Sequence, residues 1–519
     1  MFEGTSPADD GSTRRGHPIV SRSSWCVRRR PAVVVEVARR RQPKGNRVRQ
    51  SLSRLLSASL AATLVMIGPG CGALPREKAV PHGAEGRAFV PGIDPGVRTW
   101  GGASNPDFTR LMLASVQRER EELARQGFTD QLPRADFLAI SGGGADGAFG
   151  AGMICAWTEL GTRPEFKAVT GISTGALTAP FVFAGPAYDG VLRELYTGIR
   201  TEDILVERGL IGGFLSDAMA DTAPLWKLLS KHVDQKLMDA IAAEYRKGRL
   251  LVIGTTNLDA RRAVLWNVGE IAASGAPGAL DLVRKILIAS AAIPAAFPPV
   301  LIDVEVDGKR YQEMHVDGGA MTQVFLYPAS LRLREQAEAE GIVRERRAYI
   351  IRNARLDPDW SQVDRRTLSI AGRAISALIA TQGLGDLYRL YADCQRDGVD
   401  YNVAYIPPDF DVPAREAFDP TYMKALFERG YEMTRHGSPW HKFPPGFDTP
   451  IEMSSAPSAG DPSFGPTAST GRIPRASDLA SMAALGLGGV TYRLPPASVP
   501  TSASANARPM GAMIFAAPR

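Results

Sequence analysis

The pentapeptide at residues 171–175 combines a possible nucleophile with glycines at the positions that a tight turn requires. Gly171-Ile172-Ser173-Thr174-Gly175 follows a short apolar run and precedes a helical pattern. In a sharp strand-to-helix turn, glycines on both sides of the serine relieve steric clashes and leave the hydroxyl exposed at a helix N-terminus. An ordinary helix N-cap serine is the alternative interpretation. The pentapeptide therefore indicates Ser173 as a candidate nucleophile for acyl transfer.

A second glycine-rich segment, FLAISGGGADGAFGAG, occupies residues 137–152. A predicted strand leads into Gly142, Gly143 and Gly144, and a predicted helix follows. Such a loop can direct several N–H groups at one anion, with the helix dipole adding positive character. Together with Gly147 the segment also fits the dinucleotide fingerprint G-x-G-x-x-G. That fingerprint requires an acid at the end of the next strand, where this chain has residues 171–175 instead, so an oxyanion loop is favoured.

A serine nucleophile needs a base, and the segment His315-Val316-Asp317-Gly318-Gly319 offers two. Residues 315 and 317 share one face of a strand, so the pattern allows either side chain to be the base. A turn-forming role for Asp317 and a partly exposed strand position for His315 are equally compatible with the residues.

Composition narrows the classes of function. The net charge of +6 comes from residues 1–50, where eleven Arg and one Lys against four acids give +8, leaving −2 for the rest. We therefore expect no nucleic-acid partner. The four cysteines and six histidines show no metal-ligand spacing, so a metal site is not expected.

Residues 48–71 have the pattern of a secretory signal peptide. Arginines precede an apolar run, Leu55–Ile67, that is too short to anchor a chain across a bilayer. The small residues before Cys71 resemble the lipobox of bacterial lipoproteins, in which the cysteine is acylated, whereas cleavage after Ala73 would release a soluble protein. A buried helix with a free thiol is the alternative. We expect export to a bacterial cell envelope, either anchored through Cys71 or periplasmic or secreted.

The remaining boundaries follow from composition. Residues 1–47 resemble neither a signal nor a domain and are interpreted as a non-native or unstructured leader, with Val48 as an alternative start. Residues 72–103, rich in Pro and Gly, are interpreted as a linker. Residues 104–445 form the predicted catalytic domain. Residues 446–519 form a low-complexity tail that is predicted to be largely disordered.

Periodicity within residues 104–445 predicts alternating strands and helices. Predicted strands are 137–140, 166–170, 250–255 and 349–352, with a hairpin at 301–316 turning at Asp307-Gly308. Predicted helices are 105–125, 176–184, 224–245, 282–292, 369–381 and 420–434. The alternation predicts an α/β fold around a mostly parallel sheet, followed by a helical C-terminal region.

Four blocks in this order resemble the patatin-like phospholipase family: the glycine loop, the GxSxG turn, ASAAIPAAFPP at residues 289–299, and Asp-Gly-Gly at 317–319. The resemblance spans residues 135–355 and implies a three-layer α/β/α core. It also implies a Ser–Asp dyad without histidine. Carried over by position, Ser173 is the nucleophile, Asp317 the base, and Gly142, Gly143 and Gly144 the oxyanion loop.

The resemblance implies hydrolysis of lipid carboxylic esters through an acyl-enzyme, with a lipid ester as substrate and a membrane surface as partner. It implies no metal and no organic cofactor. Acyl transfer to another alcohol would use the same residues, and a non-catalytic membrane lipoprotein is the alternative from another class. One departure concerns Asp146, which stands where the family often has a basic residue. An acid that pointed into the oxyanion loop would oppose catalysis, whereas one that capped the next helix would not. Oligomeric state is left open.

Overall fold

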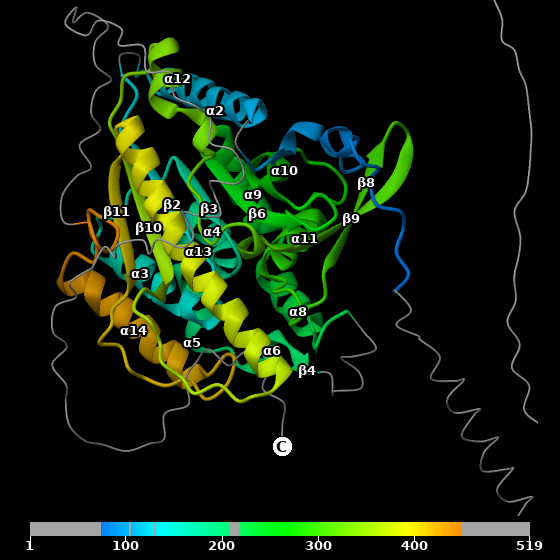
Figure 1. The fold of residues 1–519 in the computed structure, drawn as a ribbon. Helices are drawn as coiled ribbons and strands as arrows, with labels where there is room; N and C mark the ends of the chain where they lie inside the picture. The colour runs from blue at the N-terminus through cyan, green and yellow to red at the C-terminus, as the bar shows by residue number, and fades with distance from the viewer. Residues whose placement is uncertain (1–73, 103–104, 129–130, 208–216, 448–519) are drawn as a thin grey trace, which may run out of the picture. The chain divides into compact units, whose positions relative to one another are not determined.

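A nine-stranded mixed sheet forms the centre of the fold in the computed structural model, which describes residues 74–102, 105–128, 131–207 and 217–447 (Figure 1). The strands follow the order β1-β7-β6-β3-β2-β10-β11, and β9 joins through β6 and carries β8 at its other edge. Their bounds are β1 (Arg98–Trp100), β2 (Ala135–Ile140), β3 (Ala168–Gly171), β6 (Leu250–Asn257), β7 (Arg262–Asn267), β8 (Val300–Val306), β9 (Lys309–Asp317), β10 (Arg346–Arg355) and β11 (Asp400–Ile406). A separate ribbon pairs β4 (Val206–Glu207) with β5 (Ala220–Asp221).

Five neighbouring strands, β11, β10, β2, β3 and β6, run parallel. The strands β7, β9, β1 and β8 add antiparallel pairs at one side. The parallel strands β2 and β6 are buried along their whole length, as expected for parallel strands covered on both faces. The expectation of a mostly parallel sheet is confirmed.

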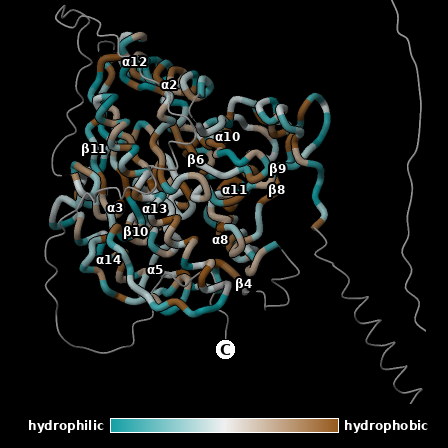
Figure 2. Tube along the Cα trace, viewed as in Figure 1, coloured by the Kyte–Doolittle hydropathy of each residue, from teal (hydrophilic) through white to brown (hydrophobic). Residues whose placement is uncertain are grey.

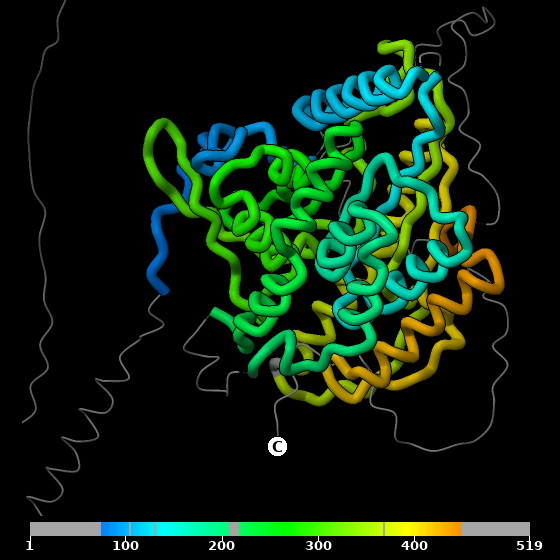
Figure 3. The backbone as a smooth tube through the Cα atoms, turned by 180° about the vertical axis from the view of Figure 1, so that it is seen from behind, coloured from blue at the N-terminus to red at the C-terminus, as the bar shows by residue number. Residues whose placement is uncertain are grey.

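Helices cover both faces of the sheet (Figures 1 and 3). One layer contains α2 (Pro106–Arg125), α12 (Leu333–Ala339) and α13 (Thr367–Asp397). The other contains α3 (Gly147–Glu159), α4 (Thr174–Ala184), α5 (Asp189–Thr197), α8 (Ala223–His232), α9 (Gln235–Arg246), α11 (Ala279–Ala291) and α14 (Pro420–His436). Shorter helices are α6 (Thr201–Ile204), α10 (Val268–Ala273) and the 3-10 turns η1 (Glu85–Arg87), η2 (Pro95–Val97), η3 (Gly144–Asp146), η4 (Pro186–Tyr188), η5 (Gly318–Ala320) and η6 (Ala329–Leu331).

Alternation along the strands divides the apolar side chains between two cores. On β2, Leu138 and Ile140 face the layer that contains α3, whereas Phe137 and Ala139 face the layer that contains α2 and α13. The hydrophobic stretches of the sheet are visible in Figure 2. This two-sided packing is the three-layer α/β/α arrangement that the resemblance implied.

The interpretation of residues 72–103 as a linker is wrong from residue 74 onward. In the described part of this segment, β1 pairs with β7, and Phe89 bridges to Glu305 on the β8–β9 hairpin. Val97 is buried, and Arg98 forms a buried ion pair with Glu313. The Pro and Gly residues of this segment form tight turns between short contacts with the domain. From composition alone, the same residues indicate a flexible linker.

Other elements differ from the prediction in extent. The pattern at 224–245 forms two helices, because Asp234 caps α9 by accepting a hydrogen bond from the Leu237 N–H. The helix predicted at 369–381 is the first part of the 31-residue α13. The hairpin is as predicted, with Asp307 and Gly308 both at positive φ, as a two-residue turn of type I′ requires. The strands β7 and β11 were not predicted.

Several sequence-based predictions concern residues outside the described ranges: the leader 1–47, the signal peptide 48–71 with Cys71, and the tail from residue 448. Within the described ranges, no helix combines the length and apolar character that crossing a bilayer would need. The two cysteines in the described chain, Cys155 and Cys394, are buried free thiols.

Candidate active site

Ser173 lies in the turn between β3 and α4, with φ 53° and ψ −125°. This positive φ is a strained conformation for a residue with a side chain. The flanking glycines make the turn possible, because a Cβ at Gly171 would collide with the Gly175 backbone, and one at Gly175 would collide with the Ile140 carbonyl. The sequence therefore builds the strained strand-to-helix turn that exposes a nucleophile above a sheet.

The hydroxyl of Ser290 on α11 fixes the backbone of this turn through two hydrogen bonds. It accepts a hydrogen bond from the Ser173 backbone N–H at 3.0 Å and donates to the Gly254 carbonyl of β6 at 2.7 Å. Ser290 is fully buried and belongs to the block at residues 289–299. Part of this block therefore has a physical role, since it fixes the backbone of the candidate nucleophile.

The glycine loop after β2 packs directly against Ser173. A Cβ built on Gly142 would lie 3.0 Å from the Ser173 Cβ and 3.7 Å from its Oγ. The N–H of Gly142 donates to the Gln323 carbonyl at 3.1 Å and is therefore unavailable to a substrate. The N–H groups of Gly143 and Gly144 have no acceptor within the described chain. The predicted loop of three glycines thus offers two free donors rather than three.

Two residues of β10 hold the glycine loop in place. The Asn353 amide donates to the Ser141 carbonyl at 3.0 Å, and the Asn353 N–H donates to the Ser141 hydroxyl at 2.8 Å. Arg352 donates to the Ser141 hydroxyl at 3.2 Å and to the Gly142 carbonyl at 3.3 Å. Arg352 is buried, and burial lowers its pKa to about 10. A positive charge therefore lies directly behind the loop.

Asp317 ends β9 and is buried beside Ser173. Its Oδ1 accepts the Gly319 N–H at 2.7 Å. Burial raises the pKa of Asp317 to about 7, although the neighbouring Ser173 side chain and the Gly319 N–H oppose this rise. A carboxyl group with such a pKa can exchange a proton near neutral pH.

His315 has different partners, although it lies two residues away on the same strand. Its Nδ1 is 3.0 Å from the Thr255 hydroxyl, and its Nε2 is 3.1 Å from a Glu313 carboxylate oxygen. The side chain is completely buried rather than partly exposed. Burial lowers the pKa of His315, even though Glu313 opposes this. Of the two possible bases that the sequence left open, His315 is engaged by Thr255 and Glu313, whereas the Ser173 side chain acts on the pKa of Asp317.

Asp146 does not cap α3 through its side chain, although it occupies the N-cap position. Its carboxylate instead accepts a hydrogen bond from the Tyr422 hydroxyl of α14 at 2.7 Å. Burial raises the pKa of Asp146 to about 6, against the opposing effects of the Tyr422 hydrogen bond and of the nearby charge of Arg352. The positive charge beside the glycine loop therefore comes from Arg352 on β10 and not from the loop itself.

Four supporting residues were not identified from the sequence: Ser290, Gln323, Arg352 and Asn353. Gln323 donates from its side-chain amide to the Gly319 carbonyl at 2.8 Å, and its backbone N–H donates to Asp386 on α13 at 2.6 Å. Ser290 could have been found as the one polar side chain in an otherwise apolar block. Arg352 and Asn353 lie within β10, and Gln323 follows the turn after Asp317; the neighbours of all three are known only from the fold.

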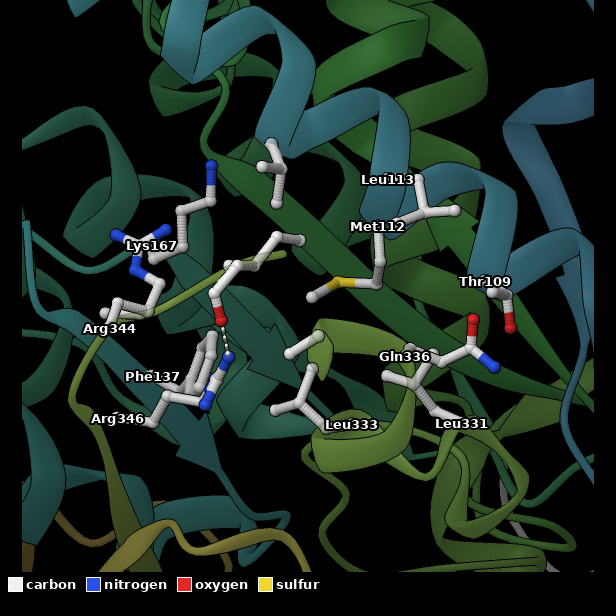
Figure 4. Close-up of a pocket in the computed structure, with 14 residues that line it drawn as sticks. Thr109, Met112, Leu113, Phe137, Lys167, Leu331, Leu333, Gln336, Arg344 and Arg346 are labelled. Carbon is white, nitrogen blue, oxygen red and sulfur yellow. Dashed lines mark hydrogen bonds between the residues drawn. The ribbon is translucent and has the colours of Figure 1, made fainter. Parts of the chain in front are cut away.

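A pocket lies between α2 and α12, at the end of the sheet where β2 begins (Figure 4). Met112, Leu113 and Leu333 line it, and the Arg346 guanidinium reaches the Ile342 carbonyl at 3.4 Å. The pocket contacts Ala135, the first residue of β2, whereas the glycine loop follows the last residue, Ile140, which is about 17 Å further along the strand at ~3.3 Å per residue. This pocket is therefore separate from Ser173. In the described ranges, no group of three or more His, Cys, Asp or Glu side chains is placed to hold a metal ion.

Comparison with known proteins identifies a family for part of the chain. VipD from Legionella pneumophila is among the solved structures that match, with 13% sequence identity and a TM-score of 0.29 over 58% of this chain and 66% of VipD, just under two thirds of its length. No curated protein matches the chain. Residues 138–329 match the model of the patatin-like phospholipase family, and this range contains Ser173, Asp317 and the glycine loop. The chain therefore carries a patatin-like phospholipase domain.

Proposed function

We propose that the protein hydrolyses the carboxylic esters of lipids, with Ser173 as nucleophile and Asp317 as general base. The observation that carries this proposal is the burial of Asp317 next to Ser173, whose strained turn packs against the glycine loop; this burial raises the pKa of the Asp317 carboxyl group to about 7. The family match supports the class of reaction, because it covers this pair and the glycine loop.

The first half of the reaction forms an acyl-enzyme. The Asp317 carboxylate takes the proton of the Ser173 hydroxyl as the oxygen attacks the ester carbonyl. The resulting oxyanion accepts hydrogen bonds from the free N–H groups of Gly143 and Gly144, each worth roughly 3–4 kcal/mol in the transition state. The protonated Asp317 then gives its proton to the departing alcohol, and the acyl group remains on Ser173.

Water completes the cycle. Asp317, again a carboxylate, removes a proton from the water molecule that attacks the acyl carbonyl, and the same two N–H groups hold the second oxyanion. Collapse of this intermediate releases the carboxylic acid, and the proton returns from Asp317 to Ser173. A single carboxylate can serve both halves because its raised pKa lets it accept and release protons near neutral pH.

The test compares three variants of the full chain on short-chain and long-chain esters and on phospholipid vesicles. Ser173→Ala and Asp317→Asn are expected to lower kcat by at least about a thousandfold, as losses of triad residues do. His315→Gln is the control, with kcat expressed per folded molecule after circular dichroism and thermal unfolding. It should keep kcat within about tenfold, since its partners are Thr255 and Glu313.

Either of two results would overturn the proposal. If Asp317→Asn retained activity while folded His315→Gln lost it, the base would be the histidine. If Ser173→Ala retained activity, another nucleophile would be responsible. Mass spectrometry after rapid quenching should find the acyl group on the peptide that contains Ser173.

A further inference from the structure

Exposed apolar side chains concentrate where the chain enters α13. Thirteen large apolar residues are exposed in the described chain, and five of them fall within 19 residues. They are Trp360, Val363, Ile370, Ile375 and Leu378, and we call them the apolar face. Trp360 is 85% exposed and Leu378 is 69% exposed. Apolar residues grouped in this way on a soluble domain mark an interaction site.

The sequence around the apolar face contains little charge. Residues 369–385 include one charged side chain, Arg373. Its guanidinium is bound to the Asp359 carboxylate at 2.9 Å, and this contact ties the residue before Trp360 to the helix. Ala374, Ala377 and Ala380 extend the exposed surface between the larger side chains. A helix that only faced water would carry polar residues at these positions.

The apolar face continues into the active site. One turn beyond Leu378, the Gln382 side chain contacts the Gln323 amide at 3.4 Å, and Asp386 accepts the Gln323 N–H. With a rise of ~1.5 Å per residue, Leu378 lies about 6 Å along the axis from Gln382, and Ile370 about 18 Å. Met321, which follows the turn after Asp317, is 43% exposed and adds an apolar side chain near the site.

Cations precede the apolar face. Arg365 and Arg366 are both exposed immediately before α13, and no ion pair involves either of them in the part of the chain that the structure describes. An apolar surface edged by arginines and carrying an exposed tryptophan is typical of segments that lie in the headgroup region of a bilayer. The arginines complement anionic headgroups.

We propose that the apolar face docks the protein on a lipid bilayer, so that lipids reach the Ser173 site without crossing water. This inference rests on the proposed function for its substrate, because a lipid ester is drawn from a membrane. The apolar side chains enter the acyl boundary, Arg365 and Arg366 remain at the headgroups, and the Gln382 end of the apolar face adjoins the catalytic pair.

The experiment separates docking from catalysis. Ile375→Glu/Leu378→Glu is compared with Phe128→Glu/Val343→Glu, which adds the same charge at side chains that are 65% and 82% exposed. Both pairs are made in the full chain with Ser173→Ala, and binding to vesicles of phosphatidylcholine and phosphatidylglycerol is measured by flotation. The first pair should weaken binding at least tenfold relative to the second. Hydrogen exchange of residues 367–385 should slow when vesicles are added.

The same pairs in the chain with Ser173 intact report on turnover. The ratio of the hydrolysis rate on vesicles to that on a short-chain soluble ester should fall at least tenfold for Ile375→Glu/Leu378→Glu, and should not fall for the control. Because binding is measured without Ser173, a failure of the proposed chemistry would leave the docking result intact.

Three outcomes would overturn docking. In the first, vesicles bind but exchange of residues 367–385 is unchanged. In the second, both pairs of substitutions have equal effects on binding. In the third, Ile375→Glu/Leu378→Glu converts a dimer to a monomer in light scattering while vesicle binding is retained, which would assign the apolar face to a second copy of the chain.

Discussion

The hydroxyl of Ser290 joins the strained turn at Ser173 to the neighbouring strand, accepting from the Ser173 N–H at 3.0 Å and donating to the Gly254 carbonyl at 2.7 Å. Ser173 has a positive φ, and such a conformation persists only where surrounding contacts enforce it. Ser290 supplies one of these contacts from a different helix. The position of the nucleophile therefore depends on a side chain 117 residues later in the chain.

Replacing Ser290 with alanine should lower kcat more than it changes KM. The substitution leaves the Ser173 N–H and the Gly254 carbonyl unpaired, at a cost of about 1–3 kcal/mol in stability, and the relaxed turn should reduce kcat about tenfold or more. Ser115→Ala is the matched control, because the Ser115 hydroxyl is equally buried and donates to the Gly248 carbonyl at 2.6 Å away from the site. Steady-state kinetics and urea unfolding of both variants test this. Equal effects on kcat would contradict the positioning role of Ser290.

Activity should rise with pH through about 7, because Asp317 must be a carboxylate to accept the Ser173 proton and its pKa is raised to about 7 by burial. The acidic limb of the pH profile of kcat/KM for a soluble ester should show one ionisation, near pH 7. A limb near pH 4 would mean that the carboxyl group is not held in a desolvated environment.

The contribution of Asp317 to the free energy of unfolding should fall as pH rises, whereas activity should increase. Between about pH 4 and pH 7 the folded protein holds the Asp317 proton and the unfolded chain does not, so this group's contribution to stability is lost as pH rises. Asp317→Asn lacks the ionisation and should be more stable than the wild type at pH 8, by on the order of 4 kcal/mol at ~1.4 kcal/mol per pKa unit. Near pH 4 the two should unfold alike. Urea unfolding at both pH values measures the difference, and a wild type that gains on the variant as pH rises would refute it.

Arg352 is expected to act as a positioning residue for the oxyanion loop. Arg352→Met removes the hydrogen bonds to the Ser141 hydroxyl and the Gly142 carbonyl, so kcat should fall about tenfold to a hundredfold with little change in KM for a short ester. It also removes the charge that opposes the raised pKa of Asp146. Arg352→Lys should recover part of the loss.

Arg249→Met controls for the loss of a buried arginine. Arg249 is also buried and donates to the Phe166 carbonyl at 2.7 Å, away from the glycine loop. Arg249→Met should therefore lower the free energy of unfolding without the fall in kcat that is expected for Arg352→Met. If both methionine variants lost kcat equally, the effect of Arg352 would be structural only.

The parts of the site that were predictable are those in which local backbone geometry dictates the residue. The glycines on either side of Ser173 are required because a side chain at either position would collide with the backbone. The Asp307-Gly308 turn was predictable because its positive φ angles favour these residue types. Apolar runs identified the buried strands because a strand covered on both faces needs apolar side chains along its length. A single sequence is informative where a residue type is nearly obligatory.

The choice between Asp317 and His315 could not be made from the residues, because strand periodicity places both on one face. What separates them is that Thr255 and Glu313 occupy both ring nitrogens of His315, and these contacts come from tertiary packing. Arg352 and Asn353 were missed because parallel pairing of β10 with β2 brings them to the glycine loop from more than 200 residues away. The roles of β1 and its flanks were missed because short segments rich in Pro and Gly lack periodicity.

The ion pair between Arg98 and Glu313 has a practical consequence for where the domain can be cut. The two side chains are 5% and 1% exposed and approach to 2.6 Å; burial alone would raise the pKa of Glu313, but hydrogen bonds from His315 and Arg98 hold it at about 2. A protein shortened to residue 104, the boundary that composition favours, would lose β1 and with it the Arg98 partner of this carboxylate, which lies on the strand that ends at Asp317. Removing one partner of a buried pair costs roughly 3–5 kcal/mol. A stable shortened protein should therefore begin before β1, and one cut at residue 104 would lose activity because β9 is destabilised rather than because a catalytic group is missing.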